Sequence, residues 1–131
     1  MIVVDAGLVV AALVAADAGA VREALREEEL AAPSLLDLEV LSALRGLSRG
    51  GQLPEPRARA AVRDLGALPI QRHDHLPLLN RCWQLRDNLT VYDAAYVALA
   101  EAMQATLLTG DRRLSGASGP QCPLEVLQAA S

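Results

Sequence analysis

Short apolar segments of strand length alternate with longer helical segments along almost the whole chain. Buried strands are expected at 2–4, 30–32, 68–71, 106–108 and 124–127. The segments between them predict helices at 7–15, 17–28, 34–49, 54–65, 74–86 and 92–104. Strands that alternate with helices pair in parallel, and the helices cover both faces of the resulting sheet. The chain, residues 1–131, is therefore expected to form a single α/β domain.

Residues with known capping preferences predict where several of these helices begin and end. Ser34 and Asp17 are expected to be N-caps, because their side-chain oxygens can accept bonds from free N–H groups of the first helical turn. Thr90 precedes the helix at 92–104, and Gly50 with Gly51 is expected to end the helix at 34–49.

Composition indicates a globular protein, since 52% of the residues are apolar and 21% are charged. No apolar run reaches the length of about 18 residues that a membrane span requires. The apolar start lacks a basic leader and contains Asp5, which argues against a secretory signal. Cys82 and Cys122 have neither metal-ligand spacing nor the number needed for a disulfide framework. We therefore expect a cytoplasmic protein with no membrane partner.

Two acidic residues follow apolar strands. Asp5 ends the strand in MIVVDAGLVVAAL, and Asp111 follows the strand in LLTGDRRL. In an open α/β sheet, ligands bind at the carboxyl ends of the strands, next to the point where the strand order reverses. Both carboxylates are therefore candidates for a binding site at that edge.

Two further acidic residues lie on predicted helices. Glu39, in SLLDLEVLSALR, shares a helical face with the small residues Ser42, Ala43 and Gly46, so other elements can approach it closely. Asp93, in YDAAYVALAEA, lies in a first helical turn, where the helix dipole alone favours a carboxylate. Each acid taken singly is compatible with a structural role, and only their joint pattern indicates chemistry.

Four carboxylates at one place would repel one another. Two unit charges about 4 Å apart cost roughly 4 kcal/mol at an effective dielectric of about 20. Protons or cations must offset this repulsion. Hard divalent cations that prefer oxygen ligands, Mg²⁺ above all, suit such a cluster.

The basic residues restrict both the mechanism and the partner. All twelve are Arg, so a P-loop NTPase and a Schiff-base enzyme, which need Lys, are excluded. The net charge of −4 argues against nucleic acid unless the acids hold metal. Four arginines close in sequence to the acids are candidates for contacts with an RNA backbone: Arg45, Arg49, Arg112 and Arg113.

The order and spacing of four segments resemble those of a PIN domain, and within that family a VapC-type toxin of a type II toxin–antitoxin pair. The segments are VVDA, LDLEVLSAL, LTVYDAAYVALAEA and LLTGDRRL. This resemblance implies a three-layer α/β/α fold with a five-stranded parallel sheet in the order 3-2-1-4-5, flanked by helices. It implies a homodimer and RNA cleavage that depends on Mg²⁺ or Mn²⁺. The catalytic and metal-binding residues would be Asp5, Glu39, Asp93 and Asp111.

The resemblance also implies finer features of the site and of its partner. Thr109 matches a supporting hydroxyl that is common in the family, whereas Gly7 stands where Ser or Thr is frequent. Metal-activated water, and not the ribose 2′-hydroxyl, would cut RNA and leave a 5′-phosphate. A cognate VapB-type antitoxin would inhibit the enzyme, with an Arg at the acids and an amphipathic segment on the N-terminal helices and Leu35 to Leu47.

Other functions compete with this interpretation. His73 and His75 offer a metal-free acid–base route to RNA cleavage. A PIN or flap-like nuclease outside a toxin–antitoxin system, or a non-catalytic interaction protein, would use the same fold. A receiver domain would need a late Lys, and an aspartyl phosphatase would need a second Asp at position 7, where the chain has Gly.

Overall fold

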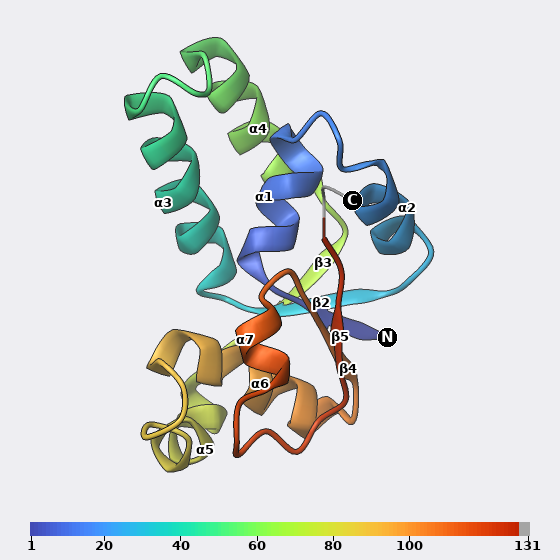
Figure 1. Cartoon of the computed structure of the whole chain (residues 1–131), viewed down its shortest axis with the longest axis vertical. Helices are drawn as coiled ribbons and strands as arrows, with labels where there is room; N and C mark the ends of the chain where they lie inside the picture. The colour runs from blue at the N-terminus through green and yellow to red at the C-terminus, as the bar shows by residue number, and fades with distance from the viewer. Residues whose placement is uncertain (129–131) are drawn as a thin grey trace.

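A parallel sheet of five strands forms the middle layer of the molecule in this computed structural model, which describes residues 1–128 (Figure 1). The strands are β1 (Ile2–Val4), β2 (Leu30–Pro33), β3 (Ile70–His73), β4 (Thr106–Thr109) and β5 (Leu124–Val126). Their order across the sheet is β3-β2-β1-β4-β5, and every neighbouring pair is parallel. The expected fold class and strand order are confirmed. The order reverses between β1 and β4, so the switch point lies there.

Helices form the two outer layers. They are α1 (Ala6–Val14), α2 (Gly19–Arg26), α3 (Leu36–Arg49), α4 (Glu55–Ala67), a 3₁₀ turn η1 (Leu76–Leu78), α5 (Leu79–Gln84), α6 (Val91–Met103) and α7 (Arg112–Ser115). Figure 1 shows α1 to α4 on one side of the sheet and α5 with α6 on the other. The hairpin of α3 and α4 extends beyond the sheet at one end of the molecule.

The core lies between the sheet and the two helices that cross its centre, α1 and α6. Val3, Val4 and Leu107 on the central strands are 3% exposed or less, as is Leu8 on α1. Helix α6 is buried over seven consecutive residues, 94–100, four of which are alanines, so it can lie close to the strands. Each fully buried Val or Leu side chain contributes about 1.5–3 kcal/mol of transfer free energy.

Two expected helix caps are wrong. The hydroxyl of Ser34 donates to the His73 carbonyl at 3.1 Å, so it ties the end of β2 to β3, and Leu35 precedes α3 instead. Helix α2 begins after Ala18 without a side-chain cap, so Asp17 does not perform that role. Thr90 does cap α6, because its Oγ1 accepts the N–H of Asp93 at 3.1 Å. Gly50 follows α3 as expected, and Gly51 has a φ of +82° that suits glycine.

Two predicted elements are displaced or divided. The strand expected at 68–71 lies at 70–73, because Leu68 still closes the last turn of α4 through a bond to the Leu65 carbonyl. The helix expected at 74–86 is divided into η1 and α5, with Pro77 in the 3₁₀ turn. Among residues 1–128, no helix is long and apolar enough to cross a membrane.

Candidate active site

Neighbouring strands place Asp5 and Asp111 together at the carboxyl edge of the sheet. Asp5 follows β1 and caps α1, because its Oδ1 accepts the N–H of Leu8 at 2.9 Å. Asp111 follows β4 and caps the short helix α7, because its Oδ1 accepts the N–H of Arg113 at 2.9 Å. Both carboxylates therefore stand at the switch point, where the sequence predicted them.

Thr109 connects these two acids. Its hydroxyl donates to Oδ2 of Asp5 and accepts the N–H of Asp111 at 3.0 Å. The Thr109 side chain is fully buried, so its hydroxyl has no solvent to bond instead. A Cβ added at Gly7 would lie 3.6 Å from Oδ1 of Asp5, so a hydroxyl side chain at this position would border the same carboxylate. Thr109 thus holds the Asp5 carboxylate in place, and its supporting role in catalysis stays a prediction.

Glu39 approaches from α3 and is held by a residue that the sequence analysis missed. Tyr96, on α6 and 3% exposed, donates its hydroxyl to Oε1 of Glu39 at 2.6 Å. Tyr96 lies three residues after Asp93, on the same helical face, and this spacing was the available signal. The hydrogen bond connects the helical layers beyond the end of the sheet.

Repulsion between the charges of three of the acids adds to the effect of burial on the pKa values of Asp5 and Glu39. Burial raises the pKa of Asp5, and the charge of Asp93 raises it further. Burial also raises the pKa of Glu39, with smaller contributions from the charges of Asp93 and Asp5. The Tyr96 hydroxyl, buried and facing Glu39, has a strongly raised pKa and remains protonated as a donor. A bound cation would relieve the repulsion between the carboxylates.

The acids line three hollows, two of which share Asp111. Asp5 and Asp111 line one hollow at the switch point, and Asp111 lines a second together with Asp93 and Thr90. Glu39 lines a third hollow against the first turns of α3 and α6. The structure thus brings all four predicted acids to one edge of the domain.

The donor set fits a hard divalent cation, although it does not form a closed cage. Among residues 1–128, no three acidic, His or Cys side chains converge tightly enough to hold one ion. Mg²⁺ usually binds one or two carboxylates and keeps several waters, which substrate phosphates can replace. An open arrangement of oxygen ligands is compatible with this mode of Mg²⁺ binding. The expected ligands, directly or through water, therefore remain Asp5, Glu39, Asp93 and Asp111.

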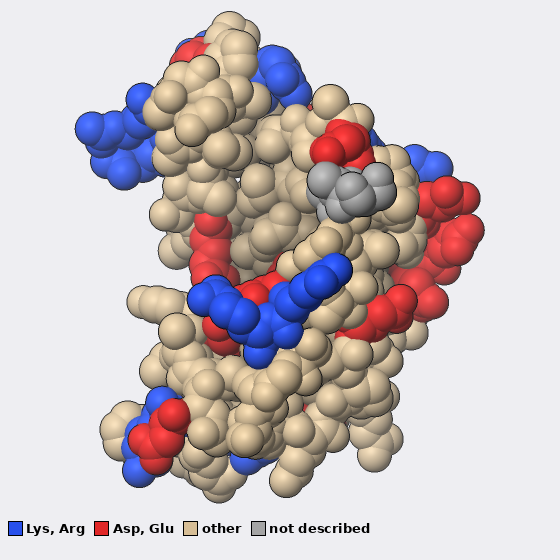
Figure 2. All heavy atoms as spheres, viewed as in Figure 1, with Lys and Arg blue, Asp and Glu red and all other residues tan. Residues whose placement is uncertain are grey.

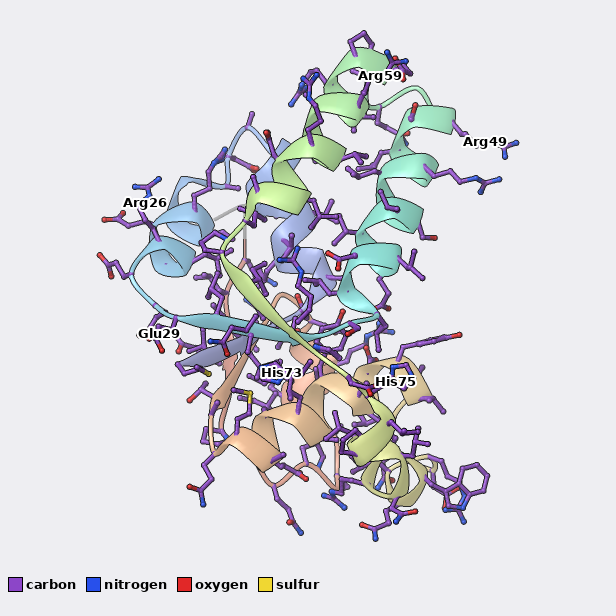
Figure 3. The ribbon with its side chains drawn as sticks, turned by 180° about the vertical axis from the view of Figure 1, so that it is seen from behind. Arg26, Glu29, Arg49, Arg59, His73 and His75 are labelled. Atoms are coloured by element: carbon purple, nitrogen blue, oxygen red, sulfur yellow. The ribbon has the colours of Figure 1, made fainter. Side chains whose placement is uncertain are left out.

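The candidate arginines divide into two groups. Arg113 bonds Asp111 through Nε and Nη2, both at 3.3 Å, and this contact lowers the pKa of Asp111. Figure 2 shows basic side chains over α7 beside an acidic hollow. Arg45 and Arg49 instead lie farther along α3 from Glu39, and Figure 3 shows Arg49 at the distal end of that helix. The role of all four arginines, Arg112 included, in RNA binding stays a prediction.

His73 and His75 lie apart from the acids. His73 ends β3, the strand at the edge of the sheet, and His75 precedes η1 (Figure 3). Neither residue lines the three acid-bearing hollows of the described chain. The structure therefore gives no shared site to the histidines and the carboxylates.

Comparison with known proteins agrees with this geometry. The model of the PIN domain family matches residues 2–119. Ribonuclease VapC1 of Mycobacterium tuberculosis is 46% identical over 96% of this chain and 97% of its own length. Ribonuclease VapC9 of the same species is 41% identical over 97% of this chain and 98% of its own.

Solved structures share the fold. PAE2754 from Pyrobaculum aerophilum superposes with a TM-score of 0.74 at 24% identity, covering 95% of this chain and 83% of that one. VapBC2 from Rickettsia felis, bound to a DNA fragment from their promoter, gives 0.72 at 15% identity, covering 98% of this chain and 100% of that one. Sequence and fold agree, and the chain belongs to the PIN-domain family, alongside the VapC ribonucleases.

Proposed function

We propose that the protein is a metal-dependent endoribonuclease that acts as the toxin of a toxin–antitoxin module. One observation carries the proposal: Asp5, Glu39, Asp93 and Asp111 line three hollows near the carboxyl edge of a PIN-domain sheet. The names of the relatives support the same activity, since VapC1 and VapC9 are ribonucleases.

The carboxylates would hold Mg²⁺ or Mn²⁺ at the switch point. Such an ion supplies a nucleophile by lowering the pKa of bound water, and it neutralises charge on the phosphate oxygens. Thr109 fixes the orientation of the Asp5 carboxylate, and Tyr96 fixes that of Glu39. Arg113, whose side chain is 93% exposed beside Asp111, is free to turn toward an RNA phosphate. Water as nucleophile would leave a 5′-phosphate on the product.

An antitoxin of the VapB type is the proposed protein partner. The related structures include a toxin–antitoxin complex from Klebsiella pneumoniae, with a TM-score of 0.61. The groove between α3 and α4 offers the partly exposed Leu41 and Val62, which suit an amphipathic segment. An antitoxin Arg could pair bidentately with the acids and exclude the phosphate. The family resemblance further implies a homodimer, which light scattering on the purified protein would test.

Substitution of the acids tests the catalytic assignment. Asp5→Asn, Glu39→Gln, Asp93→Asn and Asp111→Asn should each reduce RNA cleavage by at least about a hundredfold, with folding checked by circular dichroism. The matched control is a double variant, His73→Ala with His75→Ala, which should retain most activity. Full activity in folded Asp5→Asn would contradict the metal mechanism, and loss of activity in the histidine variant would favour an acid–base route.

Expression in cells tests the toxin role separately. The protein alone should arrest growth, and co-expression with the product of the neighbouring antitoxin gene should restore it. The purified complex should cleave RNA poorly. Normal growth of cells that contain active protein would indicate a PIN nuclease outside a toxin–antitoxin system. A folded protein that does not cleave RNA would indicate a non-catalytic interaction protein.

A further inference from the structure

An exposed aromatic ring lies beside the candidate active site. Tyr92 is 64% exposed and immediately precedes Asp93 at the start of α6. It lines a hollow of about 590 Å³ that also contains Glu39. The rest of the lining comes from the first two turns of α3 and the residue before it: Leu35, Leu38, Ser42 and Ala43.

The chemistry of the hollow differs from that of a phosphate site. Its lining contains an aromatic ring, Leu38 with 71% exposure, and the polar side chains of Glu39 and Ser42, but no Arg. A phosphate needs positive charge or several donors. A nucleobase has apolar faces that stack on aromatic rings and a polar edge with amino donors and carbonyl acceptors.

The position of the hollow fits a nucleotide that flanks the cut. Glu39 lines the hollow, and Tyr92 is adjacent in sequence to Asp93. A base bound in the hollow would therefore lie beside a phosphate held at the acids. We propose that this hollow is a stacking subsite for one unpaired RNA base next to the scissile phosphate. Tyr92 stacks on the base, while Leu38 packs beside it and Ser42 faces its polar edge. This inference rests on the ribonuclease function proposed above.

A second exposed aromatic ring provides a matched control. Trp83, on α5, is also 64% exposed, but Arg86 already covers its ring at 4.4 Å from the centroid. In the described structure Trp83 lines none of the three acid-bearing hollows. A loss of generic surface hydrophobicity would affect both aromatic variants, whereas a base subsite would involve only Tyr92.

The test compares RNA that has bases with RNA that has none. Two labelled 12-nucleotide probes of equal charge, one of mixed single-stranded sequence and one with abasic riboses throughout, are titrated by fluorescence anisotropy. The full chain carries Asp5→Asn to prevent cleavage. The normal probe should bind about tenfold more tightly than the abasic one, and Tyr92→Ala should remove most of that difference. Tyr92→Phe should retain it, because the ring remains, and Trp83→Ala should leave it unchanged.

Each outcome decides between alternatives. Equal binding of both probes by the protein with Tyr92, or an equal loss in the Trp83→Ala variant, would overturn the subsite. A change of oligomeric state in Tyr92→Ala, measured by light scattering, would assign the surface to a protein contact instead. Failure of the ribonuclease proposal is recognised separately, because the wild-type protein, which retains Tyr92, would then cleave no RNA.

Discussion

Buried hydroxyl groups hold two of the acids of this site. Thr109 and Tyr96 each donate a hydroxyl to a carboxylate, and both are almost fully buried, so the bonds are sheltered from water. A bond to a charged group contributes about 1.5–3 kcal/mol, and much of it is lost when one partner is removed. Carboxylates held in this way need less reorganisation when a cation binds.

Replacing Tyr96 with Phe should test how far Glu39 depends on its anchor. The ring still packs in the core, but the 2.6 Å bond to Glu39 disappears. We expect kcat to fall about tenfold and Mg²⁺ affinity to weaken, while the thermal midpoint changes by only a few degrees. Steady-state kinetics measures kcat, and calorimetry measures the Mg²⁺ affinity and the thermal midpoint. The effect should vanish on a Glu39→Gln background, and a full, additive loss there would contradict the positioning role.

Burial of Asp5 should be visible as a pH dependence of stability in EDTA. Its folded pKa is raised by burial, so the folded chain binds this proton more tightly than the unfolded chain. The contribution of Asp5 to stability is therefore most favourable below the unfolded pKa, near 3.8. It declines as the pH rises from there through the raised folded pKa. Urea titrations should show a smaller decline for Asp5→Asn, and identical pH profiles would contradict the assigned burial.

At the scale of elements, the sequence predicted the strands and the acidic residues that follow them, because apolar periodicity indicates both. The strands ending at Asp5 and Asp111 were located because apolar runs and the switch-point rule need no tertiary information. Ser34 was misassigned as a cap because its partner, the His73 carbonyl, is distant in the chain. Helix α7 was missed because four residues carry no helical period, and Tyr96 was missed because its bond to Glu39 spans 57 positions.

Helix α7 places the exposed Arg113 beside Asp111, a proposed metal ligand, so one substitution should change metal binding and RNA binding in opposite directions. Arg113 pairs with Asp111 in an exposed contact that contributes little to folding. Arg113→Gln should therefore leave the thermal midpoint unchanged and improve Mg²⁺ affinity slightly, because competition for Asp111 disappears. RNA binding should weaken a few-fold and its salt dependence should decrease. Weaker Mg²⁺ binding in this variant, measured by calorimetry, would contradict a competing role.

At the scale of the whole molecule, a domain with net charge −4 is proposed to bind RNA through a site built from acids. Bound cations would make this possible, because they would convert a repulsive edge into one that attracts phosphate. The same cations should stabilise the fold, since they bind the native arrangement and not the unfolded chain.

Thermal unfolding should reveal this linkage. Millimolar Mg²⁺ or Mn²⁺ should raise the thermal midpoint by a few degrees, as expected for about 1–3 kcal/mol of binding free energy. Asp93→Asn should reduce the shift, whereas the double histidine variant should keep it. An equal shift in the Asp93 variant would place the ion elsewhere.

The chemistry of the RNA ends tests the central claim most directly. RNA cut by the purified protein in Mg²⁺ should carry 5′-phosphate and 3′-hydroxyl ends, because metal-activated water attacks the phosphate, and EDTA should abolish cleavage. Mass spectrometry of the fragments identifies the ends. Cleavage that persists in EDTA and leaves 2′,3′-cyclic phosphates would show that the ribose hydroxyl is the nucleophile, and it would contradict the assignment of these four acids to a metal site.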